Sequence, residues 1–397
     1  MMKSIIRILF LSCLVWVIFD CCSAKESIRQ TPKPLPEPEE IYPFSDMVLC
    51  YGGSPHRKPF LWEASRFSDY VSYVDKNGKE QWLFDGFLFI EFCNTGRGDG
   101  IKWSYCTGYS QGDNKSAGKQ LWLELINYWF KSESGFYALE QAVSEAASRI
   151  GEPSYKRKVV VSIPDPILHL QYDDLNTTTR YWGELNGKEL DFNEPIDRLA
   201  ACAWFADEIL TRFNKAGFKN IELDGFYYIA EEITTPTEGW CYEMKKMDLV
   251  LPDLSKALHE KSKKFYWIPY RHAPGYKKGK LYGFDFVWMQ PNYFWDGDKN
   301  PFDESMLSIL AARVGMELEM DEALIAGHND CSLYKMRFRA YMANAKRYGL
   351  YGKYPFTYYI GGDAFRELKA SSALEDKKIF EEFCDFIINN PVRNRCE

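Results

Sequence analysis

The segment 314–322 reads VGMELEMDE and is typical of a buried β-strand with an acidic inner face. Three apolar side chains alternate along it with Gly315, Glu317 and Glu319. Because successive side chains of a strand point to opposite sides, we expect the apolar set to contact helices and both carboxylates to face the interior of a barrel. Buried carboxyl groups are costly unless they are solvated, paired or functional. Glu317 is therefore expected either to pair with an internal Arg or Lys or, like Glu319, to serve a site.

Seven other short apolar runs have the same β-rich character, at 47–53, 84–92, 158–164, 220–229, 265–270, 285–294 and 355–362. Helical periodicity fills most gaps between the runs, at 117–149, 195–216, 241–262, 303–313, 329–348 and 374–390, with shorter helices around 62–71 and 275–281. Eight strand–helix alternations predict an α/β protein, a (β/α)8 TIM barrel with loop insertions. A doubly wound sheet would usually bring a glycine-rich phosphate loop after its first strand, and YGGSPH (51–56) lacks that spacing.

Composition and charge exclude several classes of protein. Of the 397 residues, 46% are hydrophobic and 26% are charged, which is ordinary for a globular chain and argues against disorder or a coiled coil. The formal net charge is −7 and no long Lys/Arg block occurs, so nucleic acid is not an expected partner. The aromatic content of 16% is high and calls for an explanation.

The N-terminal segment predicts export. Residues 1–24 have Lys3 and Arg7, then an apolar run that is too short to favour a membrane span, then small residues, as in a signal peptide. Cleavage near Ala24 would release the protein, whereas acylation of Cys21 or Cys22 would make it a lipoprotein. Residues 25–43 form a Pro-rich linker, and 44–397 form the barrel domain. The only membrane contact expected is this N-terminal lipid anchor.

Metal ligands and cofactor motifs do not stand out. The eight cysteines beyond the signal show no CxxC spacing, and no two of the five histidines lie at ligand spacing. We therefore predict no metal and no cofactor. A lyase or isomerase barrel would want a lumen-facing Lys or a metal cluster, and neither is evident in the eight runs.

The carboxyl ends of the strands, where TIM barrels place their sites, collect acids, amides and aromatic rings. This set suits a carbohydrate, because aromatic faces stack on sugar rings while amides and acids bind hydroxyl groups. Glycoside hydrolysis needs two carboxyl groups, and we predict Glu231 as general acid/base and Glu319 as nucleophile, with Glu232 as the alternative acid. The predicted substrate-binding residues are Glu91, Tyr227, Trp267, Trp288, Gln290, Asn292, Tyr293 and Glu317, with Trp295 as a further stacking surface.

His56 and Arg57 follow the first predicted strand and have two interpretations. They could pair with an acidic or phosphorylated sugar group, or Arg57 could form a carboxylate pair that holds its loop. The whole chain likewise has a second interpretation, a non-catalytic glycan-binding lipoprotein that keeps the barrel and its aromatic mouth.

Several blocks resemble a known family: YGGSPHRKPFLW (51–62), WLFDGFLFIEF (82–92), DGFYYIAEE (224–232), FYWIPYRHAPGY (265–276), YGFDFVWMQPNYFW (282–295) and GMELEMDE (315–322). They look like the exported bacterial family named domain of unknown function forty-eight fifty-five, common among polysaccharide-degrading gut bacteria. The resemblance implies a glycosidase-like TIM barrel in the periplasm or on the surface of a Gram-negative bacterium. Acids after the fourth and seventh strands are also similar to a large retaining glycosidase clan, although Ala230 stands before Glu231 where that clan has Asn. The ELDGFYY stretch (222–228) is faintly similar to chitinase-type barrels.

Overall fold

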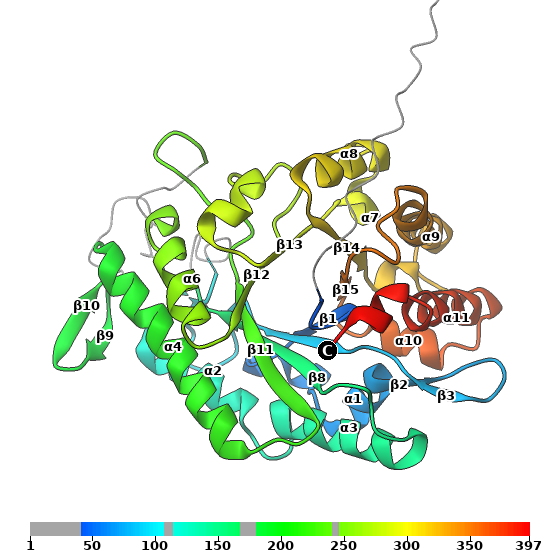
Figure 1. The fold of residues 1–397 in the computed structure, drawn as a ribbon, viewed down its shortest axis with the longest axis horizontal. Helices are drawn as coiled ribbons and strands as arrows, with labels where there is room; N and C mark the ends of the chain where they lie inside the picture. The colour runs from blue at the N-terminus through cyan, green and yellow to red at the C-terminus, as the bar shows by residue number, and fades with distance from the viewer. Residues whose placement is uncertain (1–40, 107–113, 167–179, 240–245) are drawn as a thin grey trace, which may run out of the picture. The chain divides into compact units, whose positions relative to one another are not determined.

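The computed structural model describes residues 41–106, 114–166, 180–239 and 246–397. Eight parallel strands close into a barrel, each paired with the next along the chain and the last with the first. The strands are β1 (Asp46–Tyr51), β4 (Gly86–Ile90), β8 (Arg157–Ile163), β11 (Ile221–Tyr228), β12 (Lys264–Trp267), β13 (Phe286–Met289), β14 (Gly315–Met320) and β15 (Phe356–Ile360). All eight runs predicted from the sequence are strands, and the predicted TIM barrel is confirmed (Figure 1).

Helices surround the strands as an outer ring, which Figure 1 shows in a view along the barrel. They are α1 (Ala64–Val71), α2 (Lys119–Trp129), α3 (Gly135–Ile150), α4 (Pro195–Ala216), α6 (Leu251–His259), α8 (Phe302–Ala312), α9 (Cys331–Arg347), α10 (Ala364–Ala370) and α11 (Leu374–Ile388). Pro195 begins α4 and left-handed Gly217 ends it, the usual preferences at helix ends.

Two predicted helices are wrong in detail. The segment 117–149 is not one helix, because the chain turns after α2 and restarts at Gly135, whose φ of +61° and close approach to the Trp129 backbone require glycine. The short helix expected at 275–281 is the 3-10 helix η4 (Tyr276–Tyr282).

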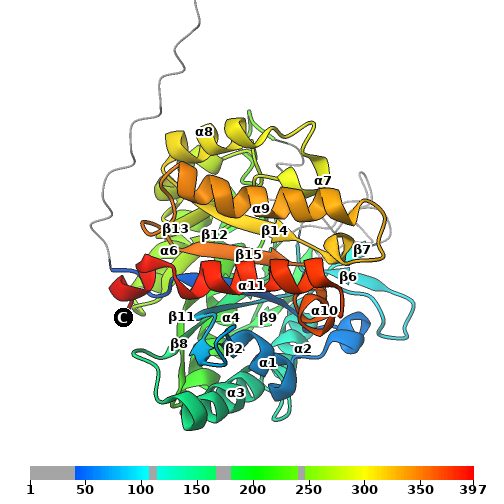
Figure 2. The same ribbon diagram turned by 90° about the vertical axis from the view of Figure 1, so that its right-hand side faces the viewer.

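The insertions are three small sheets outside the barrel. In the first, β2 (Ser72–Val74) pairs with β3 (Glu80–Trp82). In the second, β6 (Lys102–Ser104) lies between β5 (Cys93–Asn94) and β7 (Asn114–Ser116). In the third, β9 (Tyr181–Leu185) pairs with β10 (Lys188–Asp191). The short helix α7 (Tyr293–Asp296) follows β13. In Figure 2, β6, β7, α7 and α10 lie at one end of the barrel and the C-terminus lies at the other.

The C-terminal segment helps to close the amino end of the barrel. The 3-10 helix η6 (Pro391–Arg395) brings Arg393 to within 3.6 Å of the buried carboxylate of Asp46. The Tyr358 hydroxyl donates to the same carboxylate at 2.6 Å. Burial raises the pKa of Asp46 to about 6, and Arg393 acts in the opposite direction. This end is therefore held by buried polar contacts, and the carboxyl end of the strands is left for a site.

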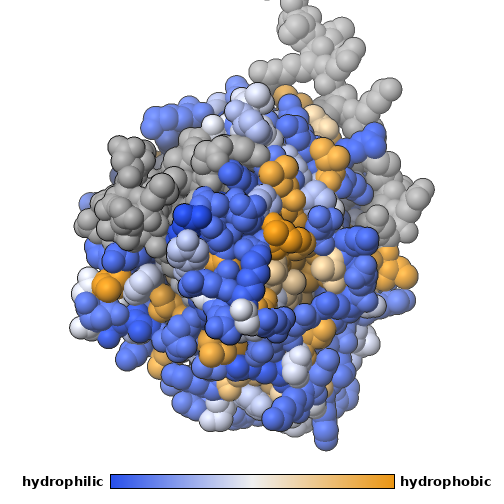
Figure 3. Space-filling model, turned by 90° about the vertical axis from the view of Figure 1, so that its left-hand side faces the viewer, coloured by the Kyte–Doolittle hydropathy of each residue, from blue (hydrophilic) through white to orange (hydrophobic). Residues whose placement is uncertain are grey.

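Most of the aromatic excess is core. Trp288 is 1% exposed, its ring packs against Phe44 and Tyr266, and its indole N–H donates to the Pro355 carbonyl at 2.8 Å. The structure thus places Trp288, predicted to bind substrate, in the core and outside the lining of the pocket described below. The face shown in Figure 3 is mostly hydrophilic, with one strip of apolar side chains near its centre and smaller apolar spots scattered around it.

Gly315 makes room for that tryptophan. The β13–β14 register pairs Trp288 with Gly315, and a Cβ atom there would lie 2.3 Å from Trp288 Cδ1. We expect Gly315→Ala to lower the free energy of unfolding by about 1–3 kcal/mol, the usual cost of overpacking a core. Urea denaturation would measure this, with Gly96→Ala as control, because a Cβ there would have its nearest neighbour at 3.4 Å. Equal midpoints for the two variants would contradict the packing argument.

The N-terminal predictions fall outside the described residues. The signal peptide at 1–24, the acylation sites Cys21 and Cys22, and almost all of the linker at 25–43 precede residue 41. Among the helices that the structure describes, none is long and apolar enough to cross a membrane.

Candidate active site

A pocket of about 190 Å³ lies at the carboxyl end of the barrel. Residues in or directly after β1, β4, β11, β12, β13, β14 and β15 all contribute to it. Its lining consists of Leu49, Tyr51, Ile90, Phe92, Tyr227, Glu231, Ile268, Gln290, Trp295, Glu317, Glu319 and Tyr359. Three carboxyl groups, one amide and several aromatic rings therefore surround one small space, at the end where barrels of this type carry their chemistry.

Glu319, the fifth residue of β14, is the most firmly held of the three acids. It is 2% exposed, and its Oε2 accepts hydrogen bonds from the Tyr341 hydroxyl at 2.5 Å and from the Asn292 backbone N–H at 2.7 Å. The Asn292 side-chain amide also approaches Oε1 at 3.4 Å. Asn292 has a left-handed backbone with φ of 53°, which Asn adopts more readily than most residues. Both oxygens of Glu319 act as acceptors, which is the pattern of an ionised carboxylate held in one orientation.

Glu231 lies three residues beyond the end of β11 and has fewer partners. Its Oε1 accepts a hydrogen bond from the Gln290 amide at 3.0 Å, and Gln290 also donates to the Ile268 carbonyl at 3.2 Å. The indole N–H of Trp267 donates to the carbonyl of Ala230 at 2.7 Å and so fixes the backbone just before Glu231. Trp267, predicted as a sugar-stacking surface, is fully buried, stacks on Phe284 and lies outside the pocket lining.

Glu317 lies deeper on the same face of β14. The parallel register sets it beside Thr357, as it sets Glu319 beside Tyr359. It is 2% exposed, and its Oε1 has no hydrogen-bond partner among the residues that the structure describes. The structural ion pair weighed as one alternative for this residue is not among the described contacts, and Glu317 instead lines the pocket.

Burial raises the pKa of all three carboxyl groups. It raises the pKa of Glu231, against the Gln290 donor, and it raises the pKa of Glu319 to about 8, against the donors from Tyr341 and Asn292. Burial, and after it the charges of Glu319 and Glu231, raise the pKa of Glu317 well above its usual range, while the Thr357 side chain acts in the opposite direction. Three acids in one small pocket cannot all ionise at neutral pH, so their titrations are coupled.

Glu231 and Glu319 differ in the number of donors that stabilise their charged forms. Glu319 accepts hydrogen bonds from the Tyr341 hydroxyl and from the backbone and side-chain N–H groups of Asn292. Glu231 accepts one hydrogen bond, from the Gln290 amide. Hydrogen bonds to a carboxylate favour its ionised form, so the contacts favour ionisation of Glu319 over Glu231.

Tyr341 gives a direct test of this electrostatic balance. Phe at this position removes a donor that favours the ionised form of Glu319, so we expect its pKa to rise above the wild-type value of about 8. The limb of the pH profile of kcat/KM that reports Glu319 should move to higher pH, and kcat should fall about 10–100-fold. The control is Tyr348→Phe, whose hydroxyl bonds Asp303 on the outer helices. An unchanged profile in Tyr341→Phe would mean that Glu319 does not limit the reaction.

The aromatic lining has one outer member. Trp295 is 39% exposed, its indole N–H donates to Asp321 at 2.6 Å, and its ring meets Tyr359 edge to face. Tyr227 is buried within the pocket wall. Tyr293 instead packs against Phe302 and lies outside the lining, so of the predicted rings Tyr227 and Trp295 are the ones that line the pocket.

Glu91 does not join the pocket. Its carboxylate forms an ion pair with Arg57 at 3.2 Å and accepts the Phe92 backbone N–H at 3.0 Å. The structural interpretation of Arg57, a carboxylate pair that holds the loop after β1, therefore describes its observed contact. The predicted sugar contact of Glu91 is not supported, since Glu91 is buried and already paired.

One group in the described part of the chain has the composition of a metal site. His56, Glu91 and Cys93 bring one ligand atom each to within 4.8 Å of one another. Arg57 already neutralises Glu91, and burial raises the pKa of the Cys93 thiol to about 11, which keeps it protonated. Both features disfavour a cation at this group.

Glu232, the alternative acid, turns away from the pocket. It is buried, its Oε2 accepts a hydrogen bond from the Tyr270 hydroxyl at 2.7 Å, and it is not among the lining residues. Its neighbour Glu231 is the member of this pair that lines the pocket.

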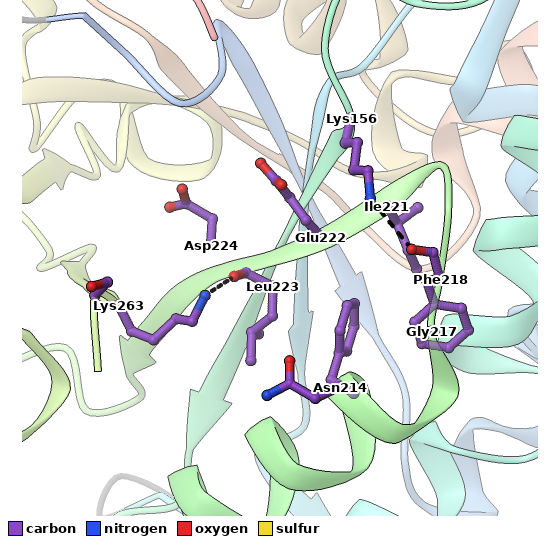
Figure 4. Close-up of a pocket in the computed structure, with 11 residues that line it drawn as sticks. Lys156, Asn214, Gly217, Phe218, Ile221, Glu222, Leu223, Asp224 and Lys263 are labelled. Carbon is purple, nitrogen blue, oxygen red and sulfur yellow. Dashed lines mark hydrogen bonds between the residues drawn. The ribbon is translucent and has the colours of Figure 1, made fainter.

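A larger pocket of about 430 Å³ lies at the amino end of β11 (Figure 4). In it the ammonium group of Lys263 donates to the Leu223 carbonyl at 2.6 Å, and Lys156 approaches the Phe218 carbonyl at 3.4 Å. Figure 4 shows Glu222 and Asp224 on the opposite side of the strand from Leu223. Their partners are Lys158 and Tyr266, so the charged groups here already have contacts within the scaffold.

Tyr341 is the functional residue that sequence reasoning missed. It lies on α9, a helix outside the barrel, and its hydroxyl contacts Glu319, which precedes it by 22 residues. The sequence indicates only a helix over 329–348 and does not single out Tyr341. A Tyr rather than a Phe facing the end of an acid-bearing strand was the only signal available.

Fold and site together define the class: a TIM-barrel protein with a carboxylate-lined pocket at the carboxyl ends of its strands. The chain belongs to the family described as Domain of unknown function (DUF4855), whose model matches residues 46–385, and this confirms the resemblance seen in the sequence.

Several solved structures are similar to this chain. An endo-1,4-beta-D-mannanase from Thermotoga petrophila is 10% identical, with 86% of this chain and 99% of that chain covered and a TM-score of 0.44. An intracellular xylanase from Thermoanaerobacterium saccharolyticum is 13% identical, with 61% and 75% covered and a TM-score of 0.35. Tryptophan synthase from Pyrococcus furiosus is 9% identical, with 87% and 97% covered and a TM-score of 0.34. No curated protein matches the chain.

Proposed function

We propose that the protein is a glycoside hydrolase that acts on an oligo- or polysaccharide. The observation that carries this proposal is that Glu231 and Glu319, from β11 and β14, line the same pocket together with aromatic rings and an amide. Two carboxyl groups beside one sugar are the requirement of this reaction. The rings and the amide supply the stacking and hydroxyl contacts that a sugar needs.

In the proposed mechanism Glu319 is the nucleophile and Glu231 the acid/base. Glu319 attacks the anomeric carbon while Glu231 donates its proton to the leaving oxygen, so a glycosyl ester forms as the glycosidic bond breaks. Glu231, now ionised, takes a proton from a water molecule that attacks the ester and restores free Glu319. Asn292 and Tyr341 keep Glu319 oriented, and Gln290 does the same for Glu231.

The test is a screen of residues 44–397 against plant, host-mucin and bacterial-envelope glycans, with product analysis by chromatography. Glu231→Gln and Glu319→Gln would run alongside, and Glu232→Gln is the matched control because its carboxylate lies outside the pocket. We expect new oligosaccharides with the wild type and the control and none with the other two. Retention of a glycan without any product would favour the non-catalytic glycan-binding alternative.

We further propose that the protein is exported from a Gram-negative cell, either to the periplasm or as a lipoprotein at the cell surface. The basic, apolar and small-residue regions of 1–24 support export, and the Pro-rich segment 25–43 suits a tether. Labelling with a radioactive fatty acid would separate the routes. Incorporation that is lost in Cys21→Ser or Cys22→Ser would establish a lipid anchor, and a soluble, unlabelled periplasmic product would contradict it.

A further inference from the structure

The pocket has a one-sided charge pattern. Three of its lining residues are glutamates, and none of the described residues that line it is Lys, Arg or His. The guanidinium carbon of Arg57 lies 5.2 Å from the centre of the Tyr51 ring, but the guanidinium group forms its ion pair with Glu91. The other charges that influence the three acids belong to carboxyl groups, since Glu231 and Glu319 act on Glu317 and Glu232 acts on Glu231. Among the described residues, the lining of the pocket therefore carries carboxyl groups and no cationic side chain.

Glu317 is the lining carboxyl group whose hydrogen bonding is incomplete. It is buried, it lines the pocket, and its Oε1 has no hydrogen-bond partner among the described residues. A buried carboxyl oxygen without a partner is costly, and native proteins usually satisfy such atoms with a protein group, a water or a ligand. The proposed mechanism uses Glu231 and Glu319 and leaves Glu317 without a task. The Thr357 side chain lies beside Glu317 and favours its charged form as a donor. Because the carboxyl group also lines the pocket, a bound ligand can supply a donor to the acceptor that remains.

We propose, on the basis of the glycoside hydrolase function above, that the sugar bound in this pocket carries a free protonated amine and that Glu317 recognises its ammonium group. An ammonium group has three donors and no acceptor, which matches a pocket of carboxylate acceptors. It also supplies the balancing positive charge, as buried charges in proteins require. Glu317 is thus a specificity-determining residue for amino sugars.

Other sugar classes fit this pattern less well. A uronic acid or a sulfated sugar would add a negative charge to a pocket whose described lining is acidic and holds no cationic side chain. An N-acetylated sugar keeps an amide donor but loses the positive charge. A neutral sugar could donate a hydroxyl hydrogen bond to Glu317 but brings no positive charge to the carboxyl groups. An ammonium group also lowers the pKa of nearby carboxyl groups, which would bring Glu319 into the ionised form that attack requires.

The test measures binding of monosaccharides to the protein by isothermal titration or saturation-transfer NMR at pH 7. The probes are glucosamine and galactosamine, their N-acetyl forms, glucose, galactose and glucuronate. We expect one of the two free amino sugars to bind at least about tenfold more tightly than its N-acetyl and neutral counterparts, and glucuronate not to bind. Glu317→Gln should remove this preference, and Glu232→Gln, whose carboxylate lies outside the lining, should keep it.

The outcomes separate the inference from the function on which it rests. Tighter binding of a neutral or N-acetylated sugar, or an unchanged preference in Glu317→Gln, would overturn the amino-sugar assignment and leave glycoside hydrolysis standing. If the glycan screen shows hydrolysis of neutral glycans alone, the amino-sugar assignment is likewise overturned and glycoside hydrolysis is kept. If none of the probes binds and no glycan is cleaved, both proposals fail. Thermal melting of Glu317→Gln would show whether the variant is folded, and Glu317→Asp gives a second variant that keeps the charge.

Discussion

Replacement of Glu319 by Gln is expected to lower kcat by about 10⁴-fold or more, because an amide cannot form the glycosyl ester. The variant should keep its fold and its affinity for the sugar, since Gln has nearly the same size and its amide oxygen can still accept from Tyr341 or Asn292. Steady-state kinetics would measure the loss, and titration with substrate would measure the affinity. Such a separation of turnover from binding is what removal of a nucleophile predicts.

Two further experiments test whether Glu319 is the nucleophile. Smaller variants leave space for an added anion, so Glu319→Ala with azide should yield a glycosyl azide of inverted anomeric configuration, formed by one displacement in place of two. The wild type should give a first product of retained configuration, seen by NMR. A product of inverted configuration from the wild type would instead make Glu319 the base for a water molecule. Turnover by Glu319→Gln equal to that of the wild type would exclude the residue from the chemistry.

The strands could be predicted because their signal is local. Each is a short apolar run bounded by turn residues, and the regular succession of runs and helical periods left few alternatives to a closed barrel. Once the barrel is assumed, the carboxyl ends of its strands must meet at one face. Glu231, Glu317 and Glu319 were therefore predicted to share a site although 86 residues separate the first from the second.

Depth and orientation could not be predicted in the same way. Trp288 and Gln290 have the same strand parity, yet the register sets Trp288 opposite Gly315, the first residue of β14, while Gln290 reaches Glu231. Depth depends on the stagger between neighbouring strands, which a single sequence does not reveal. The predicted strand at 285–294 was also too long, because the chain leaves β13 after Met289 and turns at Asn292.

Contacts made by loops and helices could not be predicted from the sequence either. The Arg57 ion pair that occupies Glu91 depends on how the loop after β1 folds back, and the Tyr341 contact depends on how α9 packs. Both contacts join residues from different elements, and the alternation of strands and helices does not predict such pairs. Export and lipidation depend on residues 1–24 and remain predictions.

Replacement of Glu231 by Gln is expected to lower kcat by about 10²–10⁴-fold on natural glycans, because the leaving oxygen then departs without a proton. The loss should depend on the leaving group. An aryl glycoside with a strongly acidic phenol needs little protonation, so its first step should proceed at nearly the wild-type rate and its glycosyl ester should accumulate. A rapid burst of phenol followed by slow turnover would reveal this, because the second step still needs Glu231 as base.

The control for this experiment is Glu232→Gln, which makes the same chemical change one residue along the chain. Glu232 faces Tyr270 and lies outside the lining, whereas Glu231 lines the pocket and accepts from Gln290. We therefore expect the control to keep its activity on both kinds of substrate. A large loss in Glu232→Gln together with full activity in Glu231→Gln would exchange the two assignments. It would also mean that the loop after β11 turns over when the sugar binds, because the present orientation directs the carboxylate of Glu232 toward Tyr270.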